Sequence, residues 1–380
     1  MKTNKYSLTI TSNYLNHYSL ALSKEMKKIF KDFHFVVCEK LPEERKSLGF
    51  DDLNNLDFVV REWEEPDKVK NLFINSDFVI TDYNYNKYLK ERLKLNKPVA
   101  YDSERLFKDD NSLFKILRYM KYWWLYHNDK KSPLLCISAY TASDYNSIGL
   151  FKDRAYKWAY FSDAIEYDDF DKMLSSKNKN SLIWAGRLIK WKHPEYAIEV
   201  AKGLKELKYD FSLNIIGNGE MENELKDLIN KYDLNKEVHL LGSMPPDKVR
   251  KYMEESQIYL FTSDRGEGWG VVLNEAMNSG CACVASYETG STPFLVDDGD
   301  NGLVYKNNNV DELFNKTKYL LDNNDELNRI ANNAYKTIVN EWNPKIAAEK
   351  FYLFVDSIYK NKETRNLFEK DVLSKALPIE

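Results

Sequence analysis

The sequence has few cysteines, only Cys38, Cys136, Cys281 and Cys283 among 380 residues. Four scattered cysteines are too few for a disulfide scaffold, and three of them lie in apolar runs typical of buried strands. This usage excludes a disulfide-rich secreted class and favours a reducing cytoplasm.

Long apolar runs are also missing. A membrane-spanning helix needs about 18 or more apolar residues in a row, and no run approaches that length. The start, MKTNKYSLTITSNYLNHYSLALS, has no uninterrupted apolar segment and no small-residue cleavage site, so we expect no secretory signal. We expect a cytoplasmic protein, soluble or peripheral at the inner face of the cell membrane.

The chain lacks a strong charge of either sign. Its 55 Lys and Arg residues nearly balance 59 Asp and Glu residues, giving a formal net charge of -4. Without a global basic field, we expect no nucleic-acid partner. The length of 380 residues exceeds what one core usually supports, so two domains are expected.

Short apolar runs alternate with amphipathic helical stretches, which is the pattern of parallel βαβ units. Twelve runs are candidate strands: 6–11, 34–38, 56–60, 78–81, 98–101, 134–138, 182–185, 211–216, 238–241, 258–261, 282–285 and 302–305. The predicted fold class is therefore α/β, with two Rossmann-like, doubly wound parallel sheets in tandem. In such sheets, ligands bind outside the carboxyl ends of the strands.

The domain boundary is predicted from a loss of apolar periodicity in residues 169–180, which read as a linker. Residues 1–168 would form the first domain and residues 181–359 the second. After Asn343-Pro344, a periodic helix runs towards the tail. This terminal helix, or the tail of about residues 360–380, can leave the second domain and pack back on the first.

A basic turn follows the first strand of the second half, in GRLIKWKHPEY. Gly186 ends the strand, Arg187 and Lys192 follow, and Pro194 can start a helix. Free backbone amides at a helix start, together with these cations, form a good anion site. The alternative is a basic turn that is only exposed to solvent and binds no ligand.

Glycine is scarce where a dinucleotide-binding protein would need it. The segment IIGNGEMENELKDL has Gly217 and Gly219, but Glu222 stands where a third glycine would complete G-x-G-x-x-G. The first half has no such motif, so a nicotinamide oxidoreductase loses its main support. The later turn, Gly242 to Met244, could hold a flat base, or it could simply start the next helix.

The most distinctive stretch is RGEGWGVVLNEAMNSG, residues 265–280. Gly266, Gly268 and Gly270 alternate with larger residues after a predicted strand, and they allow backbone amides to approach a ligand. Glu267 lies in the predicted loop, and Glu275 follows inside a short helix capped by a glycine.

Together, these segments resemble the retaining glycosyltransferases of family four, which have the GT-B fold. The resemblance covers the second half almost continuously, and Glu267 and Glu275 match the E-x7-E motif of that family. It implies two domains that face a central cleft, with the donor bound by the second. It also implies that the substrate is a nucleotide sugar, with UDP as the expected nucleotide. No cofactor is expected.

The resemblance also implies residue roles. Arg187 and Lys192 would bind the donor diphosphate, Glu275 the ribose, and Glu267 would lie near the transferred sugar, so the expected catalytic residues are Glu267, Arg187 and Lys192. The other expected donor-binding residues are Gly186, Gly242, Met244, Gly268, Trp269, Gly270 and Val271. Where the family commonly has glycine after this lysine, the chain has His193, which puts the local backbone geometry in question.

The first half matches the family less well. Asn13 and His17 stand in the loop before the first predicted helix, where the family often has glycines. Ser103, Glu104 and Arg105 follow the fifth strand, where the family often has a histidine. These five residues are candidates for binding the acceptor, with a capping or packing role the alternative for His17.

Two Asp-x-Asp pairs, Asp169-Phe-Asp171 and Asp298-Gly-Asp300, are interpreted as solvated, so no metal is predicted. Residues 113–131 carry five basic side chains against one acid, together with Trp123 and Trp124. This segment is either an interfacial helix for an anionic membrane or a helix that packs its aromatic residues on the sheet.

The predicted function is retaining, metal-independent sugar transfer to a glycan, lipid-linked or other acceptor in bacterial polysaccharide or glycoconjugate synthesis. Two alternatives stay open. A nucleotide-sugar epimerase can share the fold, and a non-catalytic partner subunit of a glycosyltransferase could share the sequence pattern.

Overall fold

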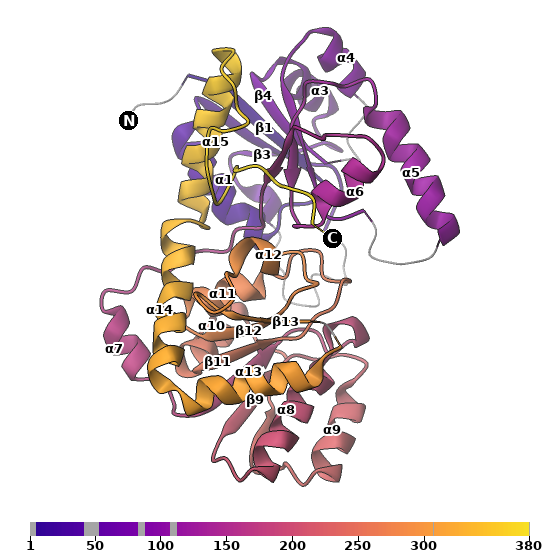
Figure 1. The fold of residues 1–380 in the computed structure, drawn as a ribbon. Coiled ribbons are helices and arrows are strands. Elements are labelled where there is room, and N and C mark those ends of the chain that lie inside the picture. The colour runs from indigo at the N-terminus through magenta and orange to yellow at the C-terminus, as the bar shows by residue number, and fades with distance from the viewer. Residues whose placement is uncertain (1–4, 42–52, 83–87, 107–111, 307, 380) are drawn as a thin grey trace. The chain divides into compact units, whose positions relative to one another are not determined.

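The computed structural model describes residues 5–41, 53–82, 88–106, 112–306 and 308–379 (Figure 1). The chain forms two compact units. Unit 1 comprises Met1–Asp163 together with Trp342–Glu380, and unit 2 is Ala164–Glu341. Each unit is built around a parallel sheet, which confirms the predicted fold class.

Unit 1 holds seven strands in the order β3-β2-β1-β4-β5-β6-β7, and all its pairs are parallel. The order reverses direction beside β1, as in a doubly wound sheet. The strands are Ser7–Ser12 (β1), Asp32–Val37 (β2), Val59–Arg61 (β3), Phe78–Thr81 (β4), Val99–Ser103 (β5), Leu134–Cys136 (β6) and Ala155–Lys157 (β7). β7 was not among the predicted strands.

Unit 1 has six helices among its described residues. They are His17–Ile29 (α1), Pro66–Asn75 (α3), Leu89–Lys94 (α4), Ser112–Tyr126 (α5), Thr141–Ser147 (α6) and Pro344–Tyr359 (α15), with a 3-10 turn at Leu53–Asn55 (η1). None of the helices in the described part of the chain combines the length and apolar character needed to cross a bilayer.

Helix α15 returns to unit 1, where it lies beside α1 (Figure 1). Its Phe351 ring packs edge-on against Phe78 of β4, at 5.5 Å between centroids, and its Tyr352 ring lies 5.4 Å from Phe30. The predicted second domain, which ends at residue 359, included this helix, but its apolar face is buried in unit 1, as the alternative of a returning terminal helix expects. The tail then pairs with β7, where Lys157 N donates to Ser374 O at 2.8 Å.

Unit 2 holds six parallel strands in the order β10-β9-β8-β11-β12-β13, which reverses beside β8. They are Ser181–Ala185 (β8), Ser212–Ile216 (β9), Val238–Leu240 (β10), Ile258–Phe261 (β11), Ala282–Ser286 (β12) and Leu303–Tyr305 (β13). The core consists mainly of Leu, Ile, Val and Ala side chains from both faces of this sheet.

The helices of unit 2 surround this sheet. They are Phe170–Ser175 (α7), Pro194–Glu206 (α8), Glu222–Lys231 (α9), Pro246–Glu255 (α10), Val272–Asn278 (α11), Thr292–Leu295 (α12), Val310–Asp322 (α13) and Asn324–Asn340 (α14), with a 3-10 turn at Lys190–Lys192 (η2).

The stretch predicted as a linker, residues 169–180, holds α7 and belongs to unit 2. It is anchored by Lys177, whose ammonium is buried and donates to four backbone carbonyls. These are the carbonyls of Met253, Glu254, Ser256 and Ser279, at 2.8–3.0 Å. Phe170 of α7 adds a second contact, because its ring stacks on that of Tyr335 with 3.9 Å between centroids. The segment is thus held by single side chains, and no residue of α7 itself is buried.

Candidate functional site

The predicted donor-binding residues lie after three strands of the second sheet. Gly186 follows β8, Gly242 follows β10 and residues 267–271 follow β11. Backbone hydrogen bonds connect the loops: Gly186 N donates to Ile216 O at 3.0 Å, and Gly217 N donates to Gly242 O at 2.9 Å. The structure therefore brings these residues to the carboxyl edge of one sheet, where such sheets bind ligands.

The two glycines after β9 are needed for this close approach of loops. Gly217 has φ +142°, and a Cβ there would lie 1.8 Å from Gly186 O. At Gly219, with φ +156°, a Cβ would lie 2.3 Å from Leu188 O. These glycines pack one loop against another, so they do not require a dinucleotide.

Lys192 and Glu267 form an ion pair between η2 and the loop after β11. Ser263 Oγ also donates to Glu267 Oε2, at 3.1 Å. The side chains of Lys192 and Glu267 are only 11% and 12% exposed, so water screens the pair little. The sequence placed both residues at the donor but did not predict that they contact each other.

Further hydrogen bonds hold these two loops in register. Thr262 Oγ1 donates to Lys192 O at 2.6 Å, and the buried Trp184 indole donates to Thr262 Oγ1 at 2.7 Å. Asp264 N donates to Trp191 O at 2.9 Å. The positions of Lys192 and Glu267 are thus fixed by the backbone as well as by their ion pair.

Trp191 is a site residue that the sequence analysis missed. The guanidinium carbon of Arg187 lies 5.8 Å from the centre of its ring, and Lys192 Nζ lies 4.7 Å from it. Arg187 itself is exposed. The sequence shows Trp191 directly before Lys192 and four residues after Arg187, and cation–π contact gives this proximity a physical reason.

His193 resolves the question of the missing glycine. It has φ 47° and ψ 51°, the left-handed conformation that glycine adopts most readily. Its Nδ1 lies 2.8 Å from Glu195 Oε1, and its Nε2 lies 3.4 Å from Asp264 Oδ2. Burial alone would lower the pKa of His193, but hydrogen bonds to Asp264 and Glu195 raise it to about 9. Two carboxylates thus stabilise a charged histidine whose backbone has the left-handed conformation that glycine usually adopts.

Glu275 lies in α11, as the sequence predicts for the segment after Gly270. Arg250 Nη1 donates to its backbone carbonyl at 2.8 Å, and burial raises the pKa of its carboxyl group, with Arg250 opposing the shift. Within the described residues, this carboxylate has no hydrogen-bond partner. Both of its oxygens are therefore available to accept from hydroxyl groups.

The backbone from Gly268 to Val271 connects the loop to α11. Gly270 has φ +88°, and a Cβ there would lie 2.3 Å from the Phe261 ring. Only glycine therefore fits this position. The Trp269 side chain points into unit 2, where it is 1% exposed and its indole donates to Asn274 Oδ1 at 2.9 Å. Trp269 therefore belongs to the core of unit 2, and its neighbours Gly268 and Gly270 are buried as well.

The turn after β10 is open on its outer side. Gly242 is exposed with φ +70°, and a Cβ there would meet no atom within 4 Å. Met244 is partly exposed and precedes Pro245, the residue before α10. An exposed backbone turn beside a partly exposed methionine has the components expected of a base-binding surface.

Two acceptor candidates lie beside β1 in unit 1. Asn13 follows the strand, and its carbonyl accepts from Glu39 N at 2.8 Å. His17 is the first residue of α1, whose N-cap is Asn16, and its ring lies 3.8 Å from that of Tyr18. Burial lowers the pKa of His17, with Asp163 opposing the shift.

The other candidates follow β5, in the same sheet. Ser103 Oγ accepts from Tyr145 OH at 3.2 Å, and Glu104 Oε1 accepts from Tyr160 OH at 2.9 Å. The guanidinium carbon of Arg105 lies 4.6 Å from the Tyr140 ring centre. β1 and β5 both neighbour β4, so all five candidates lie near one edge of the first sheet.

Asp102 is a second residue that the sequence analysis missed. Its Oδ1 is buried without a hydrogen-bond partner in the described chain. Burial, and then the nearby carboxylate of Asp82, raise the pKa of Asp102 to about 7. Asp102 directly precedes Ser103. The sequence does not indicate that it is buried, because it is a single aspartate at the end of an apolar strand.

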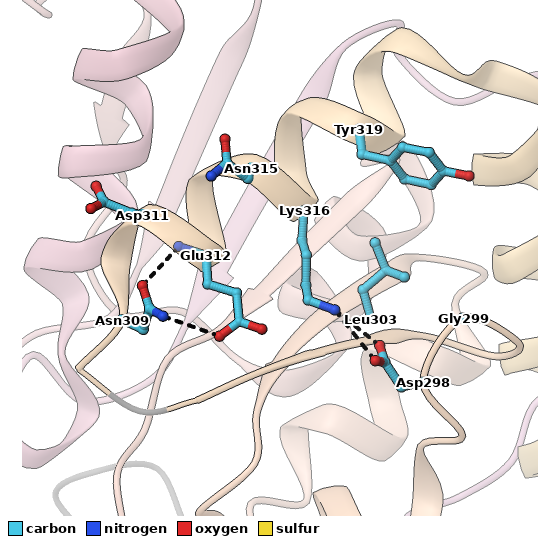
Figure 2. Close-up of a pocket in the computed structure, with 9 residues that line it drawn as sticks. All are labelled: Asp298, Gly299, Leu303, Asn309, Asp311, Glu312, Asn315, Lys316 and Tyr319. Atoms are coloured by element: carbon cyan, nitrogen blue, oxygen red, sulfur yellow. Dashed lines mark hydrogen bonds and ion pairs between the residues drawn. The ribbon is translucent and has the colours of Figure 1, made fainter.

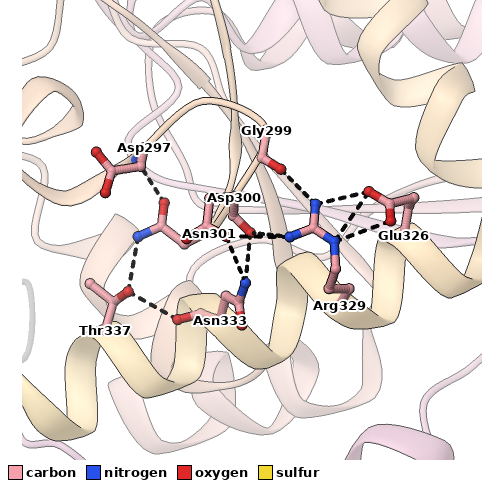
Figure 3. Close-up of polar contacts among 8 residues, drawn as sticks. All are labelled: Asp297, Gly299, Asp300, Asn301, Glu326, Arg329, Asn333 and Thr337. Carbon is pink, nitrogen blue, oxygen red and sulfur yellow. Dashed lines mark hydrogen bonds and ion pairs between the residues drawn. The ribbon is translucent and has the colours of Figure 1, made fainter.

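Three of the four aspartates in the two Asp-x-Asp pairs make contacts with other residues of the chain. Asp169 caps α7 by accepting from Lys172 N at 2.9 Å. Asp298 pairs with Lys316 at 3.3 Å beside an open hollow of about 690 Å³ (Figure 2), and Asp300 pairs with Arg329 at 3.3 Å (Figure 3). No predicted site residue lines that hollow.

Across the described residues, no group of three or more His, Cys, Asp or Glu side chains lies close enough together to hold a metal ion.

Comparison with protein families gives a match in the second half of the chain. Residues 166–337 match the family described as Glycosyl transferases group 1. This range covers most of unit 2, including the candidate donor-site residues. Unit 2 is therefore similar to this glycosyltransferase family over most of its length.

Two relatives show how far the sequence similarity extends. The chain is 33% identical over 176 residues to the uncharacterized glycosyltransferase MJ1069 of Methanocaldococcus jannaschii, covering 46% of this chain and 44% of that protein. It is 28% identical over 328 residues, 80% of each chain, to an N-acetylgalactosaminyltransferase of Campylobacter jejuni. That enzyme's full name gives a diphospho-undecaprenol-linked saccharide as its acceptor.

Among solved structures, the chain resembles Anabaena Alr3699/HepE in complex with UDP. The TM-score is 0.70 with 18% identity, covering 93% of this chain and 100% of that chain. This likeness shows the fold, which is the GT-B fold that the sequence predicts.

Proposed function

We propose that the chain is a retaining glycosyltransferase of family four, which moves a sugar from a nucleotide-sugar donor to an acceptor. The observation that carries the proposal is the Lys192–Glu267 pair at the carboxyl edge of the second sheet, inside the region that matches glycosyl transferases of group 1. UDP is the preferred nucleotide of the donor, since the solved structure of Anabaena HepE holds UDP.

The donor would span the loops at this edge. Arg187 and Lys192 bind the diphosphate, the Gly242 to Met244 turn holds the base, and Glu275 accepts from the ribose hydroxyls. The open carboxylate of Glu275 supports this role, because its oxygens are not engaged by other described residues.

Negative charge grows on the leaving diphosphate as the bond to the sugar breaks. Cations and backbone amides already held in place stabilise that charge without a metal ion. Lys192 can donate to the diphosphate while Glu267 stays beside the sugar, where a carboxylate stabilises the positive charge that develops at the anomeric carbon. Retention and independence of metal are both part of the proposal.

The acceptor would bind to unit 1. Asn13, His17 and residues 103–105 line the carboxyl edge of its sheet, and Asp102 adds a carboxyl group whose pKa lies near neutrality. Such a group can take the proton that leaves an acceptor hydroxyl. The relative from Campylobacter supports a lipid-linked saccharide as the acceptor class, in bacterial polysaccharide or glycoconjugate synthesis at the cytoplasmic face of the membrane.

The test is a panel of UDP-, GDP- and ADP-sugars, scored for nucleoside diphosphate release by the wild type and by Glu267→Ala. We expect release from one donor, stimulated by lipid-linked or glycan acceptors, insensitive to a chelator and reduced about 100-fold or more in the variant. Release that a chelator abolishes would overturn metal independence.

Two other results would point elsewhere. Conversion of one nucleotide sugar into another without an acceptor would favour an epimerase. No turnover of any donor, with a folded protein and a full acceptor panel, would favour a non-catalytic partner subunit.

A further inference from the structure

Helix α5 carries an apolar surface that faces solvent. Five of the thirteen large apolar side chains that are exposed in the described chain lie on it, within nine residues. They are Ile116 (56% exposed), Leu117 (64%), Met120 (65%), Trp123 (48%) and Trp124 (64%). We call these five side chains the α5 apolar face.

The α5 apolar face is not part of the core of unit 1. At about 100° of rotation per residue, its five side chains cover an arc of about 120° on one side of the helix. The opposite side carries tyrosines that pack inward: the Tyr126 ring lies 4.6 Å from Tyr101, and the Tyr122 ring lies 5.9 Å from Tyr145. The tyrosines therefore hold the helix on the unit, and the tryptophans are left outside.

Exposed cations flank this apolar face. Lys121, Lys130 and Lys131 are all exposed in the same segment. Arg118 is exposed too, but it lies further round the helix, near Tyr122, and donates to Leu106 O at 3.1 Å. From the adjacent helix α4, Lys90 Nζ lies 5.5 Å from the Trp124 ring centre. Lys115 lies where the structure describes no side chains.

The segment has no exposed acid to oppose these cations. Asp129 is its single acidic residue, and it is 7% exposed. Its carboxylate accepts from Tyr101 OH at 2.7 Å and from Lys131 N at 3.0 Å. The surface is therefore apolar at its centre, positive at its rim, and free of exposed negative charge between residues 116 and 131.

We propose that the α5 apolar face binds the surface of an anionic phospholipid bilayer, with the helix lying in the plane of the interface. Tryptophans are favoured at the level of lipid head groups, because their rings are apolar and their N–H groups can still reach water. Flanking lysine and arginine side chains bind the anionic head groups. A bilayer explains both the apolar centre and the basic rim, whereas a second copy of this basic helix would bring like charges together.

The inference stands apart from the proposed activity, because no candidate donor-site residue lies on α5. It is tested by flotation of the full-length protein with vesicles of phosphatidylcholine alone and of phosphatidylcholine with phosphatidylglycerol. We expect binding only to the vesicles that contain phosphatidylglycerol, weakened by salt, with a blue shift of the tryptophan fluorescence.

Two variants separate the contributions of charge and apolar surface. In Lys121→Gln with Lys130→Gln, each neutralised cation should weaken binding about fivefold. In Leu117→Ser with Trp124→Ser, binding should fall about 100-fold, because both side chains are mostly exposed and would be buried in the lipid. The exposed positions of these residues allow the variants to fold, which thermal melting checks.

The matched controls lie on unit 2. Lys226→Gln with Lys231→Gln neutralises two exposed cations of α9, and Leu207→Ser removes an apolar side chain that is 53% exposed. These variants should bind as the wild type does.

Three results would overturn the inference. They are equal binding to neutral and anionic vesicles, equal loss of binding in the controls, and sedimentation that shows a Trp124-dependent dimer with no lipid binding. The last result would assign the α5 apolar face to a second copy of the chain.

Discussion

His193 Nε2 lies 3.4 Å from Asp264 Oδ2, which connects the turn after β8 to the loop after β11. The same histidine has a left-handed backbone, with φ 47°. Lys192 directly precedes it, and Glu267 lies three residues beyond Asp264, so this contact is next to the proposed catalytic ion pair. We infer that His193 positions the pair through its charge.

The first prediction concerns the pH dependence of stability. The pKa of His193 is raised in the folded state to about 9, from 6.5. The charged histidine therefore contributes stability that is full below about pH 6.5 and is lost as the pH rises through about 9, by up to about 3 kcal/mol. His193→Asn keeps a residue that tolerates the left-handed backbone but cannot take the charge.

Thermal melting of this variant and the wild type should differ most below about pH 6.5, where the contribution of the charged histidine is full, and converge above about pH 9. His239→Asn is the matched control, because His239 is exposed on β10. A difference between His193→Asn and the wild type that stays constant from about pH 6 to about pH 10 would show that the imidazolium does not act by its charge.

The second prediction concerns the Lys192–Glu267 pair. Both side chains are largely buried, so removing one partner leaves the other charge without compensation. We expect Lys192→Met or Glu267→Gln alone to cost about 1–3 kcal/mol of unfolding free energy. The double variant should cost less than the sum of the two.

A double-mutant cycle by denaturant unfolding measures this coupling. In donor turnover the same variants should not compensate, because each residue has its own role at the diphosphate or the sugar. Recovery of turnover in the double variant would contradict those separate roles.

The third prediction is that Glu275→Gln weakens binding of the donor without lowering the stability of the fold. Because burial raises the pKa of Glu275, its ionised form is disfavoured in the folded state, and this cost is present above the unfolded pKa. The variant should therefore melt at the same temperature as the wild type or higher at neutral pH. Its KM for the donor should rise about tenfold, since a neutral amide accepts more weakly from the ribose hydroxyls.

The fourth prediction concerns Gly217, where a Cβ would lie 1.8 Å from Gly186 O and φ is +142°. Gly217→Ala should cost about 3 kcal/mol of unfolding free energy and displace the turn after β8. Gly149→Ala is the matched control, because Gly149 has φ +76° with no atom within 4 Å of a Cβ. It should cost about 1 kcal/mol, from the backbone conformation alone. Equal losses would mean that the loops do not need this close contact.

Much of the fold could be predicted because strands buried on both faces of a parallel sheet read as continuous apolar runs. β8 and β11 are such runs, with every residue buried. β7 was missed because it has only three residues, Ala155–Lys157, and lies between charged side chains. The return of α15 to the first sheet is one of the positions that the sequence allows for this helix, but the sequence does not decide between them, because an apolar helix face does not specify which sheet it covers.

The donor-site residues could be predicted as a group, since they follow successive strands and the strand order determines which loops meet. Their mutual contacts could not. The Lys192–Glu267 pair joins residues 75 positions apart. The charged His193 depends on Asp264, which belongs to another strand-end loop, and the raised pKa of Asp102 depends on burial that an isolated aspartate does not signal.

The last prediction tests whether residues 169–180 belong to unit 2. Lys177 is 7% exposed, and its ammonium donates to four carbonyl oxygens at 2.8–3.0 Å. Burial lowers the pKa of this lysine, yet the four acceptors compensate the charge. Lys177→Ala removes all four donated hydrogen bonds and should cost about 3 kcal/mol of unfolding free energy. Lys179→Ala, two residues further on and exposed, should cost less than about 0.5 kcal/mol. If the segment were a linker, both variants would unfold at the same denaturant concentration as the wild type.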